Sequence, residues 1–169
     1  MSSHHAQGTG VSAPSAPVGV LVVDDQLAVR QGVARLIASA QTGLHCLGTA
    51  ASGAEALSAA ARLRPEVVVL DADLAGEDGL ALIPQFALTA SVLVLTCHGD
   101  AATRARATRL GARAFIEKHQ PAADLLGAIA RIGTQPAIRT GEEKTPPPSE
   151  ASSHPEVAAS SDAQPRQRS

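Results

Sequence analysis

The sequence predicts an α/β fold in which five strands and five helices alternate as (βα)5 and form one doubly wound, parallel sheet. Short apolar runs alternate along the chain with longer segments whose apolar residues recur at helical spacing. Several of the runs, such as VVVL at 67–70, are apolar without interruption, which is typical of strands covered by helices on both faces. Strands separated by helices pair in parallel through right-handed crossovers.

The five predicted strands are short segments rich in Val, Leu and Ile. The first, third and fourth are almost wholly apolar, which indicates burial on both faces of the sheet. The predicted strands cover residues 18–23, 44–49, 66–70, 91–96 and 113–117.

Five predicted helices follow these strands. Ser52 and Glu55 form an S-x-x-E capping box at the start of the second helix. The third helix begins near residue 80, which places Pro84 in its first turn, where a missing N–H costs least. Gly111 is a suitable stop for the fourth helix. The remaining helices are expected over residues 27–40, 100–110 and 122–132.

The two ends of the chain differ in composition from its centre. Residues 1–17 are rich in Ser, Ala, Gly and Pro and have no apolar periodicity. Residues 135–169 contain six prolines, and Ile138 and Val157 are their only large apolar residues. Such segments bury too little surface to offset the entropy of ordering. The sequence therefore predicts a disordered leader (1–17), a domain over residues 18–134 and a disordered tail (135–169).

The composition argues against several classes of function. The formal net charge of −2 lacks the basic excess typical of a nucleic-acid-binding surface. No apolar run approaches the roughly 18 residues of a membrane span, and the N-terminus lacks the pattern of a signal peptide. Cys46 and Cys97 are too few for a disulfide framework and are expected to be reduced core residues. We expect a cytoplasmic protein that contacts neither nucleic acid nor membrane directly.

Polar side chains stand where the predicted strands end. Asp24 and Asp25 follow the first strand, and Asp71 follows the third. Thr96 closes the fourth strand, and Lys118 follows the fifth. Because ligands of an open parallel sheet bind beyond the carboxyl ends of its strands, these side chains are expected to meet at one edge of the sheet.

This set of residues suits phosphoryl transfer. Three neighbouring carboxylates repel one another, and Mg²⁺, which prefers oxygen ligands, would relieve that repulsion. Lys118 adds a compact positive charge that can contact an anion, and Thr96 adds a hydroxyl donor. A metal, a lysine and a hydroxyl around one carboxylate can hold a phosphoryl group during its transfer. Asp71 would be the nucleophile and would form an aspartyl phosphate.

Four segments carry a resemblance to a known family. They are VLVVDD (20–25), VVVLDADLAGEDG (67–79), VLVLTCHGD (92–100) and AFIEK (114–118). In this order and spacing they resemble the receiver domain of bacterial two-component response regulators, over about residues 18–134. The resemblance implies a flavodoxin-like fold and a phosphoacceptor switch rather than an enzyme.

The resemblance also implies how the acceptor site works. Asp71 would accept a phosphoryl group from a sensor histidine kinase or a phosphotransfer protein. Asp25 and Asp71 would bind Mg²⁺ with the assistance of Asp24, and the backbone carbonyl of Asp73 would complete the protein ligands. The turn after the acceptor usually carries proline in this family, whereas this chain has Ala75, so a looser loop is expected.

A conformational switch is implied in the same way. Lys118 would contact the phosphoryl group, Thr96 would move to it, and Phe115 would rotate inward with Thr96. The face made by the fourth helix, the fifth strand and the fifth helix would signal to a downstream protein, and phosphorylation could drive homodimer formation. Residues 135–169 lack the apolar-periodic helices of a helix-turn-helix, so no DNA-binding output domain is expected in this chain.

Two other functions remain open from the sequence. LDADL (70–74) also resembles the D-x-D nucleophile motif of haloacid-dehalogenase phosphatases, in which Asp71 would be an enzymatic nucleophile. In that superfamily, however, the motif normally opens the chain and the acidic pair follows the lysine. The second alternative is a pseudo-receiver that is never phosphorylated and serves as a scaffold.

Overall fold

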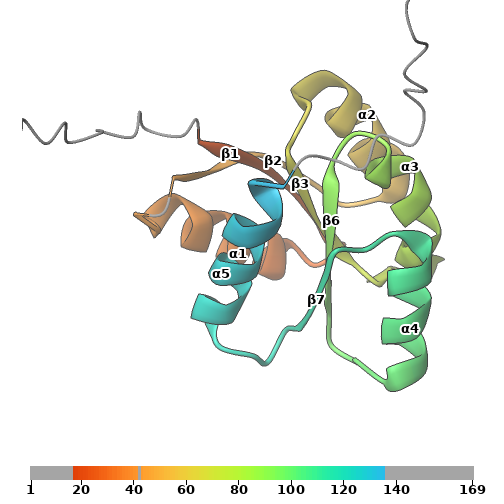
Figure 1. The fold of residues 1–169 in the computed structure, drawn as a ribbon. Helices are drawn as coiled ribbons and strands as arrows, with labels where there is room; N and C mark the ends of the chain where they lie inside the picture. The colour runs from red at the N-terminus through yellow and green to blue at the C-terminus, as the bar shows by residue number, and fades with distance from the viewer. Residues whose placement is uncertain (1–16, 42, 136–169) are drawn as a thin grey trace, which may run out of the picture.

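The computed structural model describes residues 17–41 and 43–135. Its main sheet has five strands in the order β2-β1-β3-β6-β7, and every neighbouring pair is parallel (Figure 1). This arrangement confirms the predicted doubly wound α/β fold. Apart from Pro17 and Gln135, the predicted leader and tail lie outside the described residues.

The strands of the main sheet lie within a residue or two of their predicted positions. β3 ends one residue later than predicted, so that Asp71 is the last residue of the strand. The five strands are β1 (Val18–Val23), β2 (Leu44–Ala50), β3 (Val67–Asp71), β6 (Ser91–Thr96) and β7 (Ala114–Glu117).

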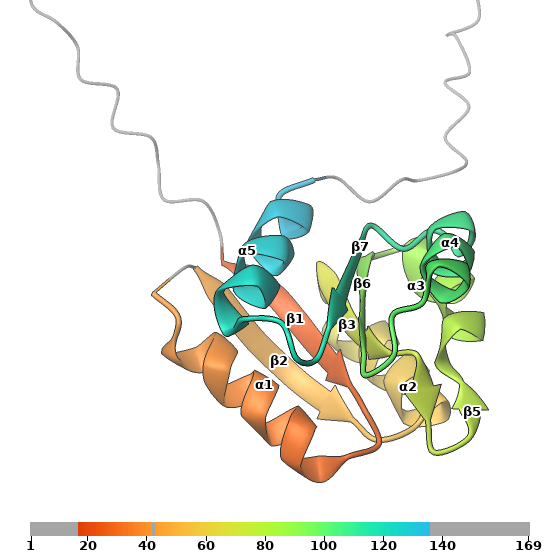
Figure 2. The ribbon, with the colours of Figure 1, turned by 90° about the horizontal axis from the view of Figure 1, so that it is seen from below.

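Helices cover both faces of the sheet. α1 (Leu27–Ser39) and α5 (Ala122–Gly133) pack on one face. α2 (Gly53–Leu63), α3 (Ile83–Ala87) and α4 (Ala101–Leu110) pack on the other (Figure 2). The three-layer arrangement buries β1, β3 and β6 on both faces, as their uninterrupted apolar runs predicted.

The alternation of side chains along the central strands divides the core into two parts. Leu21 and Val23 of β1 face α2, α3 and α4, whereas Val20 and Val22 face α1 and α5. Each such side chain contributes about 1.5–3 kcal/mol when fully buried. The two hydrophobic cores therefore hold the strands in place and fix where the strand ends lie.

The predicted signals at the helix ends are also confirmed. Ser52 Oγ accepts a hydrogen bond from Glu55 N at 3.3 Å, and Glu55 Oε2 accepts one from Ala51 N at 2.8 Å. Asp100, which was not predicted as a cap, precedes α4 and accepts a hydrogen bond from Thr103 N. Gly111 ends α4 in the left-handed region, with a φ of 108°.

The third helix is shorter than its neighbours. A 3-10 turn, η1 (Gly79–Leu82), leads into the five residues of α3, and Pro84 lies in the first turn of α3 as predicted. Gly79 packs so closely against the end of β3 that a Cβ atom there would collide with the carbonyl oxygen of Asp71. Glycine is required at this position because backbone is what the side chain would meet.

A small hairpin between β3 and η1 was not predicted. β4 (Asp73–Leu74) pairs antiparallel with β5 (Glu77–Asp78). Its two turn residues, Ala75 and Gly76, have φ angles of 55° and 91°. Proline, whose ring fixes φ near −65°, could not adopt this conformation. The expected looser loop is therefore wrong, because the turn is a tight two-residue connection.

The prediction that both cysteines lie in the core is wrong for Cys97. Cys97 follows the last residue of β6 and is exposed, because the chain has left the sheet at that point. Cys46 lies in β2, the edge strand, and is half-buried.

Candidate functional site

The polar strand ends meet at the carboxyl edge of the sheet, as predicted. Asp24 follows β1, Asp71 ends β3 and Thr96 ends β6. Lys118 follows β7, and its backbone N donates to the Thr96 carbonyl at 2.8 Å. The chain runs from β1 to β2 in one direction and from β3 to β7 in the other. The site therefore lies at the topological switch point, where ligands of such sheets bind.

Three carboxylates form an acidic cluster at this point. Oxygen atoms of Asp24, Asp25 and Asp71 all lie within 4.8 Å of one another. The side chains of Asp24 and Asp71 are only 2% and 6% exposed, whereas Asp25 is half-buried. Buried like charges at this separation are unfavourable unless opposite charge compensates them.

Lys118 supplies part of that compensation. Its Nζ atom lies 2.6 Å from Asp24 Oδ2 and 2.6 Å from Asp71 Oδ2. Burial acts to lower the pKa of Lys118, but its contacts with Asp24 and Asp71 outweigh burial and leave that pKa raised. The lysine is therefore charged at neutral pH and neutralises one of the three negative charges.

The buried carboxylates of Asp24 and Asp71 accept few hydrogen bonds. Asp71 Oδ1 accepts a long hydrogen bond from Asp73 N at 3.3 Å, and Asp24 Oδ1 accepts one from Gln26 N at 2.9 Å. Asp24 Oδ2 has no hydrogen-bond partner among the described residues and meets Lys118 as an ion pair only. Burial raises the pKa of Asp71, although Lys118 and the Asp73 N–H oppose the rise. Three converging carboxylates with an under-satisfied oxygen fit a divalent cation that prefers oxygen ligands.

Asp73 uses its side chain away from this cluster. The side chain is exposed, and Asp73 Oδ1 accepts a hydrogen bond from Gly76 N at 2.8 Å across the hairpin turn. The ligand role expected from the resemblance concerns the backbone carbonyl of Asp73 and not this side chain. That role stays a prediction.

Thr96 is buried and is held by its own loop. Its Oγ1 accepts from His98 N at 3.3 Å and lies 3.4 Å from the His98 carbonyl oxygen, to which it donates. Both contacts are long, so a stronger acceptor could displace them at small cost. The expected contact with a phosphoryl group stays a prediction.

Phe115 is half-buried against the core on the side of α2, α3 and α4. The guanidinium of Arg104 lies 4.4 Å from the centroid of its ring, a cation–π distance. Arg104 also donates to the Phe115 carbonyl at 3.4 Å and pairs with Glu117 at 3.6 Å. The ring is therefore covered by a charged side chain of α4, and its expected inward rotation is untested.

Two arginines near the site were missed from the sequence. Arg30 of α1 donates from Nη1 to the backbone carbonyls of Asp24, at 2.6 Å, and of Asp25, at 2.9 Å. Arg106 of α4 pairs with Asp78 of the hairpin through Nη1 and Nη2, which lowers the pKa of Asp78. No spacing in the sequence signals these contacts, because one has backbone partners and the other joins residues far apart in the chain.

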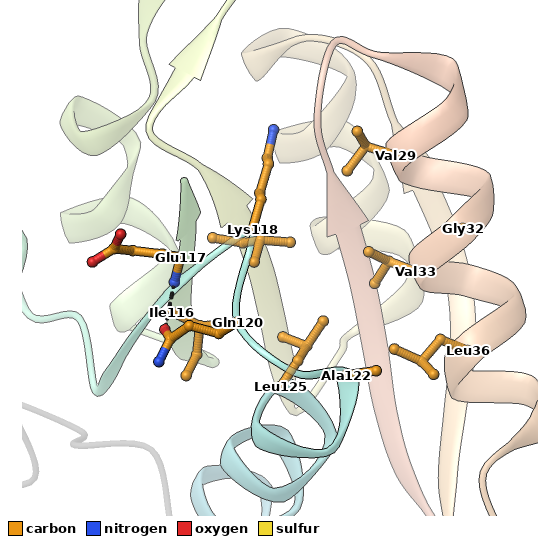
Figure 3. A pocket seen from close by; sticks show the side chains of 11 residues that line it. Val29, Gly32, Val33, Leu36, Ile116, Glu117, Lys118, Gln120, Ala122 and Leu125 are labelled. Atoms are coloured by element: carbon orange, nitrogen blue, oxygen red, sulfur yellow. Dashed lines mark hydrogen bonds between the residues drawn. The ribbon is translucent and has the colours of Figure 1, made fainter. Parts of the chain in front are cut away.

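An apolar groove opens beside the acidic cluster. It has a volume of about 280 Å³ and lies between α1 and α5, where Val29, Val33 and Leu125 line its walls (Figure 3). Lys118 forms part of the lining at one end, so the groove reaches the acceptor edge of the sheet. Leu27, at the start of α1, is one of the two large apolar side chains that are exposed in the described part of the chain.

Comparison with known protein families identifies the family of this chain. Residues 20–130 match the model of the response regulator receiver domain. The chain belongs to the response regulator receiver family. The recognition made from the four sequence segments is thereby confirmed.

Two curated relatives are longer than the part that this chain matches. A protein-glutamate methylesterase/protein-glutamine glutaminase from Anaeromyxobacter dehalogenans (strain 2CP-C) is 37% identical over 118 residues, which are 69% of this chain and 34% of that protein. A putative transcriptional regulator from Pseudomonas aeruginosa is 36% identical over 116 residues, which are 67% of this chain and 55% of that protein. The chain thus spans between a third and just over half of the length of these curated relatives.

Solved structures show the same receiver fold. The signal receiver domain of the putative response regulator NarL from Mycobacterium tuberculosis superposes with a TM-score of 0.65 at 27% identity, covering 70% of this chain and 98% of that one. A response regulator from Burkholderia pseudomallei, crystallised with a phosphorylated aspartic acid, a calcium ion and citrate, gives a TM-score of 0.61 at 27% identity over 66% of each chain.

Within residues 17–41 and 43–135, no helix is both long and apolar enough to cross a bilayer.

Proposed function

We propose that this receiver is a phosphoacceptor switch, in which Asp71 takes a phosphoryl group from a sensor histidine kinase or a phosphotransfer protein. One observation carries the proposal. The almost fully buried carboxylate of Asp71 ends β3 beside two further carboxylates, and Lys118 Nζ lies 2.6 Å from its Oδ2 atom. A lone acceptor flanked by cation ligands and a lysine is the arrangement that phosphoryl transfer needs.

Asp24, Asp25 and Asp71 would hold Mg²⁺, together with the backbone carbonyl of Asp73. Two observations support this assignment: the carboxylate oxygens cluster within 4.8 Å, and the buried Asp24 Oδ2 accepts no hydrogen bond among the described residues and meets Lys118 as an ion pair only. When bound, the cation would neutralise negative charge on the transferring phosphoryl group. Its loss should therefore abolish phosphorylation without unfolding the domain.

In the transfer step, a carboxylate oxygen of Asp71 forms a bond to phosphorus while the phosphorus–nitrogen bond of the donor phosphohistidine breaks. The imidazole leaves with the electron pair of that bond and takes up a proton. Lys118 exchanges its contact with Asp71 for one with a phosphoryl oxygen, which keeps its charge beside the negative charge of the product. The water-poor setting of Asp71 strengthens both interactions.

The conformational switch would use side chains that make only weak contacts in the unphosphorylated structure. Thr96 makes only long hydrogen bonds within its loop, and its hydroxyl would donate instead to the phosphoryl group. Movement of Thr96 would leave room for Phe115 to rotate inward, out of its contact with Arg104. The face made by α4, β7 and α5 would thereby change shape and signal to a downstream protein, with homodimer formation as one form of output.

The donor would approach over α1 and α5. Any protein that brings a phosphohistidine to Asp71 must dock next to Lys118, which lines one end of the apolar groove between α1 and α5. The switch domain would comprise residues 18–134 in a cytoplasmic protein, with the flanking segments as extensions. The family match leaves the haloacid-dehalogenase phosphatase without support, and the intact acceptor set argues against a pure scaffold.

The proposal is tested by incubating the full chain with acetyl phosphate and Mg²⁺ and measuring intact mass. The mass should rise by one phosphoryl group, and EDTA or Asp71→Asn should prevent the gain. Asp78→Asn, which changes an exposed carboxylate outside the cluster, should leave the gain intact. A gain that persists in Asp71→Asn would place the acceptor elsewhere. Turnover of p-nitrophenyl phosphate would support the phosphatase instead, and no modification under any condition would support the scaffold.

A further inference from the structure

Arg30 occupies an unusual place for an arginine beside three carboxylates. Among the described residues it forms no ion pair with any of them, and it donates hydrogen bonds to backbone carbonyls only. A single nitrogen, Nη1, donates to both the Asp24 and the Asp25 carbonyl oxygens, at 2.6 Å and 2.9 Å. Hydrogen bonds of this length from a charged donor are among the strong ones.

The two carbonyls belong to the turn that aims the acidic pair. Asp24 directly follows β1, and its N–H donates to the Ala50 carbonyl at 3.1 Å. Its side chain then accepts from Gln26 N at 2.9 Å, at the start of α1. The backbone of this turn therefore sets where the Asp24 and Asp25 carboxylates point. Arg30 holds that backbone from the first turns of α1.

We propose that Arg30 is a positioning residue for the cation site, because it clamps the turn between β1 and α1 and so keeps Asp24 and Asp25 directed at Asp71. The inference rests on the proposed function. Because the guanidinium binds carbonyls, it leaves the carboxylate oxygens free for the cation. Its positive charge opposes cation binding, whereas its geometry favours it, so the two effects have opposite signs.

Because the charge and the geometry of Arg30 have opposite effects on cation binding, a change in Mg²⁺ affinity distinguishes between them. If Arg30 acted only through charge, its removal would strengthen Mg²⁺ binding, because a repelling cation would be gone. If it were only a structural brace, its removal would lower stability and leave the Mg²⁺ affinity of the folded protein unchanged. A clamp predicts weaker binding, by roughly tenfold, as is typical when a group that orients metal ligands is lost.

The experiment is a calorimetric Mg²⁺ titration of the full chain, which suits a protein without Trp or Tyr. Arg30→Met should bind Mg²⁺ roughly tenfold more weakly, and Arg30→Lys should recover part of the affinity because its ammonium can reach a carbonyl. Arg35→Met is the matched control. It removes the same charge from the same helix at an exposed position, and it should leave the affinity unchanged.

Phosphorylation by acetyl phosphate gives a second readout. In Arg30→Met, the Mg²⁺ concentration at half-maximal rate should rise about tenfold, while the rate at saturating Mg²⁺ stays near that of the unchanged protein. If Arg30→Met does not fold, Arg30→Gln carries the same test with a shorter neutral donor. Unchanged or tighter Mg²⁺ binding in folded variants of a protein that is phosphorylated on Asp71 would overturn the clamp alone. Absence of Mg²⁺ binding in the unchanged protein would overturn both the clamp and the proposed function.

Discussion

At the scale of single residues, Asp25 is the carboxylate that the fold leaves without compensation. Lys118 pairs with Asp24 and Asp71, whereas no hydrogen bond or ion pair reaches the Asp25 carboxylate in the described part of the chain. Two unit charges about 4 Å apart at an effective dielectric constant near 20 cost up to about 4 kcal/mol before screening. This repulsion accompanies an arrangement in which carboxylate oxygens are available to a cation.

Relief of that repulsion should stabilise the metal-free protein. We expect Asp25→Asn to raise the free energy of unfolding by about 1 kcal/mol in EDTA, after screening by solvent, and to weaken Mg²⁺ binding. Thermal unfolding followed by circular dichroism measures the first effect. Asp24→Asn is the matched control, since it removes a partner of Lys118 and should give no such gain. A lower melting temperature for Asp25→Asn would mean that the Asp25 carboxylate stabilises the fold.

At the scale of structural elements, the hairpin after the acceptor holds strain at Ala75. A two-residue connection with positive φ at both positions is the geometry of a type I′ turn, for which Asn-Gly is the favoured sequence. Alanine pays about 1–2 kcal/mol for the left-handed region, because its Cβ approaches the following carbonyl oxygen.

Ala75→Asn should therefore stabilise the protein by about 0.5–1 kcal/mol, because asparagine tolerates positive φ better than alanine. Gly76→Ala should have the opposite effect of similar size, since it places a Cβ at a φ of 91°. Chemical denaturation measures both. The hairpin conformation would be wrong if Ala75→Asn lost stability or if Gly76→Ala gained it.

The same hairpin shows why part of this receiver could not be predicted. The strands, the helices and the meeting of Asp71 with Lys118 follow from apolar periodicity and from the rule for strand ends. The hairpin defies local rules, because alanine occupies a left-handed position and Asp73 faces Asp78 across the two strands. Like charges in that arrangement are unfavourable, and the compensating partner, Arg106, lies in α4. Only the tertiary structure brings that arginine to the turn.

The contacts of Arg30 and Arg104 escaped prediction for a related reason. Both arginines donate to backbone carbonyls, of Asp24 and Asp25 in one case and of Phe115 in the other. Every residue has a carbonyl, so residue identity and spacing say nothing about which one an arginine will find.

At the scale of the whole molecule, we expect the receiver to fold and to be phosphorylated without residues 136–169. α5 ends at Gly133, and Gln135 Oε1 accepts from Arg113 Nη1 at 3.0 Å, which ties the last described residue to the start of β7. Deletion of residues 136–169 should leave the melting temperature and the rate of phosphorylation by acetyl phosphate nearly unchanged. A large loss of either, or amide protection in the tail that appears only after phosphorylation, would show that the tail docks on the receiver.

We expect the phosphorylated receiver to carry its phosphoryl group on Asp71, as an acyl phosphate. The most direct measurement is borohydride reduction of the protein after treatment with acetyl phosphate and Mg²⁺, followed by peptide mass mapping, because hydride converts an aspartyl phosphate to homoserine. We expect homoserine at position 71, in the phosphorylated sample only, and at no other aspartate. Homoserine at Asp24, Asp25 or Asp73, or a phosphorylated protein without any homoserine, would contradict the account.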